Sequence, residues 1–381
     1  MARQFPAMLI LGPRQCGKTT LARQCLDGSY FDLEKPSDAQ LFAADVEGAL
    51  RRFPEPIVLD EAQRLPALFS VLRSLIDEDR KRPGRFFLLG SVDPALKREV
   101  FESLAGRIAV VELTPLLPSE TPAMSLRQCW HRGGFPDALL AEDESAWDLW
   151  QRNYMRTFVE RDLARFGLDQ SPEQLHTLLT MLAGQQGGLL NASALGRSLG
   201  VSYHTVERIL HLVEGHFLVR RLLPYHANIG KRLVKSPKLY LRDSGLLHHL
   251  AGISSAAALD RWAQRGASWE GFAIETLIAL ERMVRPSSRF WFHRTQSGSE
   301  VDLIVDRGQQ RVGVEIKLAL AVRPGDASGL LRARADGVIH SGVVLYGGNR
   351  AFPLAEGIEA LPAEPVLRGK MALTPTTPPP Q

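Results

Sequence analysis

A glycine-containing loop, GPRQCGKT at residues 12–19, constrains this chain more than any other feature of its sequence. The loop fits the pattern G-x-x-x-x-G-K-[ST] at every position, follows the apolar run AMLIL and precedes a helical pattern that begins TTLARQCL. Glycines let the backbone curl so that its amides face a phosphate, and the N-terminus of the next helix adds positive potential. The sequence therefore predicts a strand, a phosphate-binding turn and a helix, in that order.

The same residues predict an ATP site that also uses Mg²⁺. Lys18 is expected to reach the β- and γ-phosphates, and the Thr19 hydroxyl is expected to ligate Mg²⁺. Residues of the loop and one acid downstream form the predicted nucleotide site: Gly12, Pro13, Arg14, Gln15, Cys16, Gly17, Lys18, Thr19, Thr20 and Asp60.

Short apolar runs alternate with helical patterns over the first 115 or so residues, as in an α/β fold with a parallel sheet. The candidate strands are residues 7–11, 30–33, 56–60, 85–90 and 108–113. Three prolines in TPLLPSETPAMS, residues 114–125, then mark a boundary.

A pair of acids, Asp60 and Glu61, stands at the end of the apolar run PIVLD. Ligands of open α/β sheets bind at this edge, so Asp60 is expected to hold Mg²⁺ through water and Glu61 to polarise the attacking water. The alternative is an N-cap pair on the following helix. One strand lies between the two motifs in the sequence. This spacing and the acidic pair favour an ATP-hydrolysing protein over a kinase of small molecules.

Three further residues are candidates for sensing or stabilising the γ-phosphate. Ser91 follows the run RFFLLG, where such ATPases place a polar sensor, although a plain turn residue fits almost as well. Arg107 and Arg161 could each act as an arginine finger, in cis or from a neighbouring subunit of a homo-oligomer. Either could equally be a surface or ion-paired arginine.

Residues 126–225 show helical periodicity, and the segment 191–225 has the pattern of a winged helix-turn-helix that ends in a short apolar hairpin. A DNA-binding version would present Tyr203, His204 and Arg208 to the groove. A lid or an assembly surface is the alternative. Nearby basic residues could contact phosphates or form a solvated face: Lys231, Arg232, Lys235 and Lys238.

The motifs GPRQCGKTT, VLDEAQ, LLGS, ESLAGR, EVDLIVD and VEIKL occur in this order. In this the chain resembles a large bacterial and archaeal group of AAA-type P-loop ATPases that carry a C-terminal domain of uncharacterised role. Members usually have a further segment before the first strand, and a short N-terminus here would weaken adenine binding. The resemblance implies a core at 1–117, a helical lid at 118–190, a winged helix-turn-helix and linker at 191–265, a nuclease-like domain at 266–350 and a partly disordered tail at 351–381.

The C-terminal part resembles the D…(D/E)-x-K core of PD-(D/E)XK nucleases, which have an α+β restriction-endonuclease-like fold. Asp302 lies in EVDLIVD, and Glu315 and Lys317 share one face of the next strand by period-2 alternation. The resemblance implies Mg²⁺ held by Asp302 and Glu315, with Lys317 at the phosphate. Glu270 resembles the helix acid of this family, with Glu275 as the alternative. Charged β-hairpins without activity often show the same spacing.

Composition sets the limits of these expectations. With 381 residues, 45% hydrophobic and 23% charged, the chain has the composition of a globular protein of two or three domains. No apolar run reaches the roughly 18–20 residues of a membrane span, which predicts no membrane association. Three cysteines without metal-ligand spacing fit reduced thiols and a cytoplasmic protein. The net charge of +4 permits a polyanionic partner such as DNA but does not require one.

Two functions therefore fit the sequence. The first is an AAA-type ATPase that couples its nucleotide state to winged-helix and nuclease-like modules that act on DNA. The second is a nucleotide-dependent signalling or assembly switch whose nuclease-like domain is catalytically inert.

Overall fold

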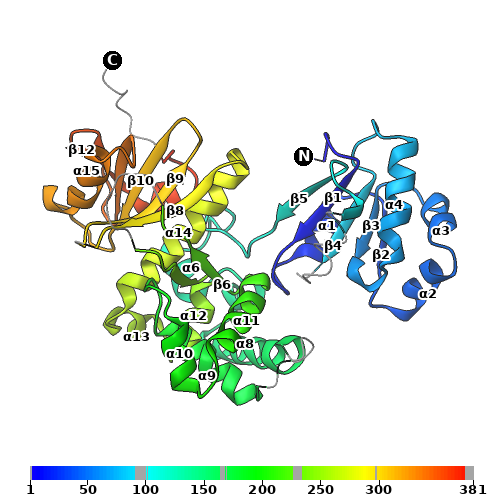
Figure 1. Ribbon diagram of the computed structural model, residues 1–381, viewed down its shortest axis with the longest axis horizontal. Coiled ribbons are helices and arrows are strands. Elements are labelled where there is room, and N and C mark those ends of the chain that lie inside the picture. The colour runs from blue at the N-terminus through cyan, green and yellow to red at the C-terminus, as the bar shows by residue number, and fades with distance from the viewer. Residues whose placement is uncertain are drawn as a thin grey trace. The chain divides into compact units, whose positions relative to one another are not determined.

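The structure, a computed structural model, describes residues 2–90, 100, 102–163, 168, 170–225, 234–296 and 298–373 (Figure 1). It divides into two compact units. The first comprises residues 1–115 with 215–217, and the second comprises residues 116–214 and 218–381.

The first unit contains a five-stranded parallel sheet with the order β2-β3-β4-β1-β5. Its strands are β1 (Ala7–Leu11), β2 (Ser29–Asp32), β3 (Ile57–Asp60), β4 (Phe86–Gly90) and β5 (Ile108–Glu112). The predicted parallel α/β core is confirmed. Strands β3 and β4 are buried at every residue, because helices cover both faces of a parallel sheet.

Helices of the first unit lie around this sheet, among them α1 (Lys18–Cys25), α2 (Pro36–Ala44), α3 (Val46–Arg52) and α4 (Ala67–Glu78). Helix α4 buries Leu68, Leu72 and Ile76, which repeat at helical spacing. All five strands run in the same direction, so the ends of β1 and β3 meet at one edge of the sheet. The phosphate-binding loop and Asp60 therefore come to the same place.

The first part of the second unit is helical, as the periodicity predicted. It contains α6 (Leu126–Arg132), α7 (Pro136–Leu139), α8 (Glu144–Thr157), a π-helical segment (Phe158–Leu163) and α9 (Pro172–Ala183). Ser125 and Ser171 begin α6 and α9 with capping boxes, in which the serine and the glutamine three residues later bond each other's backbone. Leucines of α9 and its neighbours form one apolar core with α10 and α11.

Helices α10 (Ala192–Leu199) and α11 (Tyr203–Gly215) form a helix-turn-helix around Gly200, whose φ of 69° suits glycine. The predicted hairpin within 191–225 is wrong. Strand β6 (Val219–Leu222) pairs instead with β7 (Lys238–Leu241), beyond that segment. Local spacing cannot reveal a partner strand so far along the chain. Three helices follow, α12 (Ser244–Leu250), α13 (Ala256–Arg261) and α14 (Arg265–Val284).

The C-terminal part is a mixed six-stranded sheet with the order β12-β13-β11-β10-β9-β8. Its strands are β8 (Arg289–Arg294), β9 (Glu300–Asp306), β10 (Arg311–Ile316), β11 (Ser341–Tyr346), β12 (Phe352–Ala355) and β13 (Ile358–Pro362). Helices α14 and α15 (Ser328–Ala335) pack in two separate apolar clusters against this sheet.

The sheet continues past residue 350, where the sequence predicted a partly disordered tail. Strands β12 and β13 and helix α16 (Ala363–Leu367) belong to the fold, and Ile358, Leu361 and Leu367 are buried. Their short strands contain prolines and a register shift, so they lack clean alternation. Residues 374–381 lie outside the described part of the chain. Among the helices that are described, none has the length and apolar character needed to cross a membrane.

Candidate functional site

The loop between β1 and α1 has the shape that its glycines predict. Gly17 has a φ of 99°, a left-handed conformation that other residues rarely adopt. A Cβ at Gly12 would come within 2.3 Å of the Leu113 carbonyl oxygen. The first glycine is therefore required by a neighbouring strand end, and the second by the turn into the helix.

Lys18 lies within its own loop. Its Nζ donates hydrogen bonds to the carbonyl oxygens of Gly12 at 2.9 Å and Pro13 at 2.8 Å, and the side chain is buried. These carbonyls are neutral acceptors, so the ammonium charge is held in the hollow of the loop without a carboxylate partner in these contacts. An ammonium held in this way fits the phosphates of a nucleotide.

Asp60 ends β3 beside the loop, and the Thr19 hydroxyl donates to Asp60 Oδ2 at 2.6 Å. The carboxylate is almost fully buried, and its Oδ1 accepts the backbone N–H of Glu61 at 2.9 Å. A hydroxyl and a carboxylate are the hard oxygen donors that Mg²⁺ prefers. The residues present therefore fit the ion that this fold implies.

Glu61 follows Asp60 in a left-handed conformation with a φ of 53°. Its Oε2 accepts a hydrogen bond from Gln63 Nε2, and Gln63 Oε1 is buried without a partner in the described structure. Burial raises the pKa of Glu61, and the neighbouring Asp60 carboxylate raises it further. A carboxylate with a raised pKa is a better proton acceptor, as a general base requires.

The remaining residues predicted for this site have different outcomes. Ser91 lies outside the described residues. Arg107 forms an ion pair with Asp77, with two N–O distances of 2.7 Å. It precedes β5, so it stands at the sheet edge opposite the loop, and the prediction of a finger in cis at this position is wrong. Arg161 is exposed on the π-helical segment.

A second group of acids lies in the C-terminal part, around Lys238. This lysine, on β7, is 2% exposed, and its Nζ lies 2.9 Å from Glu270 Oε1 and 3.6 Å from Asp302 Oδ1. It also forms an ion pair with Glu300. The prediction that Lys238 contacts phosphates or solvent is wrong. The side chain is buried, and its ammonium is paired with three carboxylates. Tyr240 adds a hydrogen bond to Glu270 Oε1 at 2.5 Å.

The other predicted residues of this group lie on β9 and at the end of β10. Asp302 Oδ2 accepts the backbone N–H of Ile316 at 2.9 Å, and Lys317 Nζ donates to Glu315 Oε1 at 2.7 Å. Burial, followed by Glu270 and Glu315, raises the pKa of Asp302 well above its usual value. Among the described residues, no three His, Cys, Asp or Glu side chains are arranged to hold a metal ion.

Glu275, the alternative helix acid, has a different role. Its carboxylate accepts hydrogen bonds from Arg220 on β6 and from Arg242 just after β7. These arginines lower the pKa of Glu275 to about 2 against the opposing effect of burial. Together with the Lys238–Glu270 contact, this ion cluster fastens the β6-β7 ribbon to helix α14. The two helix acids thus bind a neighbouring element of the protein.

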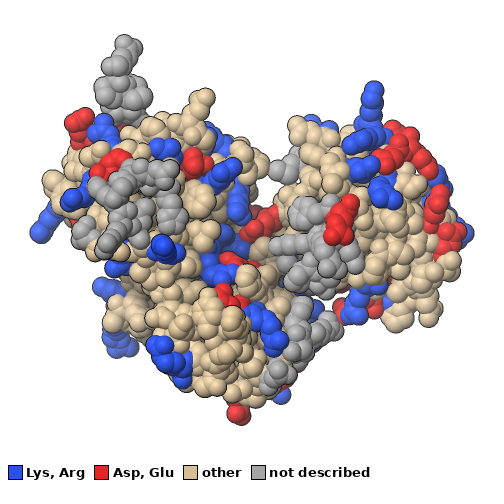
Figure 2. Space-filling model, viewed as in Figure 1, with Lys and Arg blue, Asp and Glu red and all other residues tan. Residues whose placement is uncertain are grey.

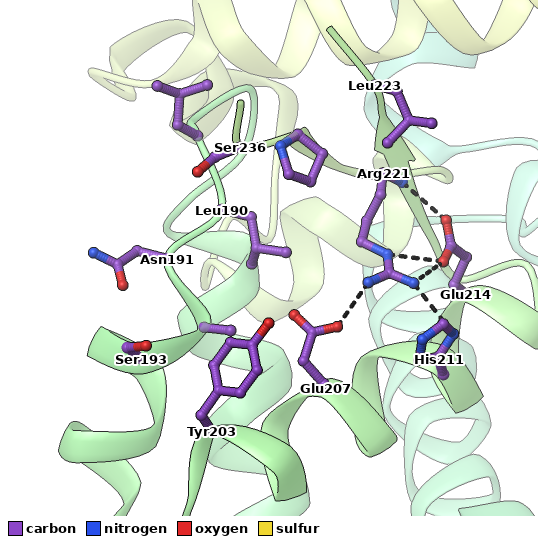
Figure 3. Close-up of a pocket in the computed structure, with 13 residues that line it drawn as sticks. Leu190, Asn191, Ser193, Tyr203, Glu207, His211, Glu214, Arg221, Leu223 and Ser236 are labelled. Carbon is purple, nitrogen blue, oxygen red and sulfur yellow. Dashed lines mark hydrogen bonds and ion pairs between the residues drawn. The ribbon is translucent and has the colours of Figure 1, made fainter. Parts of the chain in front are cut away.

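A pocket of about 890 Å³ opens between α11, the ribbon and the loop before α10 (Figure 3). Arg221 lies in its wall, where its guanidinium binds Glu214 at 2.6 Å, Glu207 at 2.9 Å and His211 Nδ1 at 3.2 Å. These three partners all come from α11, so Arg221 fixes the helix to β6. The predicted DNA-reading residues Tyr203, His204 and Arg208 are exposed on the same helix.

Among the residues coloured in Figure 2, lysines and arginines lie interspersed with aspartates and glutamates on the face of each unit that is shown. A stripe of lysine and arginine is the usual electrostatic footprint of nucleic-acid binding. The coloured residues of this face carry both signs of charge and not one alone.

Three family models match successive segments of the chain. Residues 4–121 match the family model described as AAA domain. Residues 124–257 and 265–366 match domains of unknown function, DUF8612 and DUF4143. The first of these two spans both the region predicted as a lid and the helix-turn-helix.

Two relatives cover almost the whole chain. The uncharacterized proteins Mb2031c of Mycobacterium bovis and Rv2008c of Mycobacterium tuberculosis are each 40% identical over 365 residues, which is 95% of this chain and 81% of theirs. Among solved structures, the Aeropyrum pernix ORC1 protein in complex with DNA is 13% identical and covers 67% of this chain and 88% of that one. Its TM-score of 0.29 is too low to indicate a shared overall fold.

Proposed function

The chain belongs to the family of Mb2031c and Rv2008c and carries an AAA domain, and from this premise we propose that it binds ATP with Mg²⁺ and hydrolyses it. The observation that carries the proposal is the contact between Thr19 and Asp60. It brings a hydroxyl of the phosphate loop within 2.6 Å of a carboxylate 41 residues away. Lys18 and Glu61 flank this contact with a cation and a base.

The chemistry follows from these positions. Lys18 neutralises charge on the β- and γ-phosphates, and Thr19 and Asp60 would hold the metal ion. Bound Mg²⁺ would supply further neutralisation of the charge that develops on the transferred phosphoryl group. Glu61 accepts a proton from the attacking water as the oxygen of that water bonds to the γ-phosphorus, and ADP leaves with the bridging oxygen.

Phosphate release measured with wild type, Glu61→Gln and Lys18→Ala tests this proposal. Removal of a general base typically costs roughly 10²–10⁴-fold in rate, so Glu61→Gln should bind ATP but release phosphate more slowly by that factor. Lys18→Ala should lose nucleotide binding. Glu47→Gln, an exposed glutamate paired with Arg51, is the matched control and should keep its activity.

Unchanged turnover in Glu61→Gln would remove this residue from the mechanism. Absence of turnover in a wild-type protein that still binds ATP would reduce the proposal to nucleotide binding.

For the C-terminal part, we propose a nuclease-like fold that does not cleave DNA, which makes the protein a nucleotide-dependent switch. The position of Lys238 supports this second candidate: its ammonium is buried among Glu270, Glu300 and Asp302, where a nuclease would need a divalent cation. DNA contact through the exposed face of α11 remains compatible with such a switch.

A nicking assay on supercoiled plasmid, with Mg²⁺ or Mn²⁺, separates the switch from the nuclease. The expected result is no cleavage above a protein-free control. Metal-dependent cleavage that disappears in Glu315→Ala would assign nuclease activity to this domain and overturn the switch. A gel-shift measurement with Arg208→Ala and Tyr203→Ala tests DNA contact separately.

A further inference from the structure

A tyrosine that the motifs did not single out contacts the acid of the ATP site. Tyr30, on β2, donates its hydroxyl to Asp60 Oδ2 at 2.8 Å. The same oxygen accepts the Thr19 hydroxyl at 2.6 Å, and Oδ1 accepts the Glu61 N–H at 2.9 Å. Three neutral donors from three segments therefore fix the rotation of this carboxylate.

The position of the Tyr30 ring is itself determined from two sides. β2 pairs with β3 so that Tyr30 stands opposite Val58, two residues before Asp60. The ring packs against an apolar cluster that includes Ile10 and Ala22. On its other side, the Arg23 guanidinium carbon lies 4.2 Å from the ring centroid, a cation–π geometry. The hydroxyl is thus aimed at Asp60 by its own strand and by helix α1.

We propose that Tyr30 is a positioning residue for Mg²⁺, acting through Asp60. This rests on the proposed ATP site. A carboxylate that holds a metal through water must point in one direction, and partners that orient metal-binding groups typically contribute 10–100-fold to metal affinity or activity. Because Tyr30 is neutral, it orients Asp60 without cancelling the charge that attracts the ion.

Two properties fit Tyr30 for this role. A phenolic hydroxyl is a neutral hydrogen-bond donor at neutral pH, and the Tyr30 hydroxyl lies 2.8 Å from Asp60 Oδ2. Its hydrogen bond leaves Oδ1 of Asp60 with a single protein donor in the described structure. A residue that served only to fill space would need the ring but not the hydroxyl.

Tyr30→Phe separates these roles, because it keeps the ring and its packing under Arg23 and removes the hydroxyl, which interacts with Asp60 and Arg23. Binding of Mn²⁺ to the ATP complex, measured by electron paramagnetic resonance, should weaken about 10-fold, at the lower end of the range for such partners. Binding of a fluorescent ATP analogue in the presence of EDTA should not change. The half-saturating Mg²⁺ concentration for phosphate release should rise by the same factor as the Mn²⁺ dissociation constant.

Tyr225→Phe is the matched control and should leave Mn²⁺ binding unchanged, since this tyrosine of the second unit also lies under an arginine, with the Arg311 guanidinium carbon 5.5 Å from its ring centroid. Equal Mn²⁺ affinity in wild type and Tyr30→Phe would overturn the proposal, as would an equal loss of ATP binding with and without metal. If the wild-type protein does not hydrolyse ATP, the Mn²⁺ measurement still tests Tyr30. Failure of the proposed function and failure of this inference are therefore distinguishable.

Discussion

The ATP site and the acid group of the C-terminal sheet both centre on buried aspartates, Asp60 and Asp302, but different groups hold them. Asp60 accepts hydrogen bonds from two hydroxyls and a backbone amide, all neutral. Asp302 and its neighbours Glu270 and Glu300 surround the ammonium of Lys238. Neutral donors leave the negative charge of a carboxylate available to a metal ion, whereas a buried ammonium already balances it.

Similar residue types therefore have different chemical properties in the two places. In the first unit, the nearby cation Lys18 binds carbonyl oxygens and can turn to a phosphate without leaving a carboxylate unpaired. In the C-terminal part, withdrawal of Lys238 would leave three acids close together in a buried place. The identity of the donors therefore distinguishes a site that is ready for a ligand from one that is satisfied by the protein itself.

Removal of the buried lysine should have the largest effect. Lys238→Met leaves Glu270, Glu300 and Asp302 without their cation, and breaking a buried pair in this way costs about 3–5 kcal/mol of the free energy of unfolding. Denaturant unfolding at neutral pH measures the loss. Lys235→Met, an exposed neighbour, should change stability by less than about 0.5 kcal/mol. A Lys238→Met protein as stable as wild type would show that the acids do not depend on this cation.

Glu275→Gln should have the next largest effect, with a distinctive dependence on pH. The arginines lower the pKa of Glu275 from 4.5 to about 2, so folding favours its ionised form by about 3 kcal/mol. This contribution is fully present above pH 4.5 and is lost as the pH falls toward 2. The difference in unfolding free energy between wild type and Glu275→Gln should therefore shrink over that interval.

Glu356→Gln provides the control for this pH series, since Glu356 is 84% exposed in its pair with Arg334 and should contribute little at any pH. A wild-type advantage over Glu275→Gln that stays constant down to pH 2 would contradict the assignment.

The residues that could be predicted from sequence are those whose partners are close along the chain. The loop at Gly12 to Thr19 and the pair Asp60–Glu61 directly follow strands. The sequence therefore predicts both their residue types and their place at one edge of the sheet. Tyr30 could not be found in this way, because its hydroxyl reaches Asp60 only through the register of β2 on β3.

The C-terminal acids show the same limit more severely. Their types and spacing were visible, but Lys238 comes from a ribbon 32 residues before Glu270 and was interpreted as a surface charge. The pairing of β8 with β9 also shifts by one residue near Asp302, with Trp291 opposite Ile304 but His293 opposite Val301. Such an irregularity can redirect a side chain. A sequence pattern of strict alternation does not predict it.

The smallest expected effect is the response of the C-terminal part to added metal. In Asp60→Asn, which would impair the proposed metal site of the first unit, Mn²⁺ should change the unfolding temperature by less than about 1 °C, since Lys238 already occupies the acid group. A metal at 100 times its dissociation constant would stabilise the fold by about 2.7 kcal/mol. In a domain of this size, each kcal/mol raises the unfolding temperature by roughly 2–4 °C. The double variant Asp60→Asn/Lys238→Met is the control for this measurement. Its C-terminal carboxylates have lost their cation, so Mn²⁺ should stabilise this protein. A shift of several degrees with Lys238 in place would mean that these acids bind a metal as readily as Asp60, and the distinction between the two sites would fail.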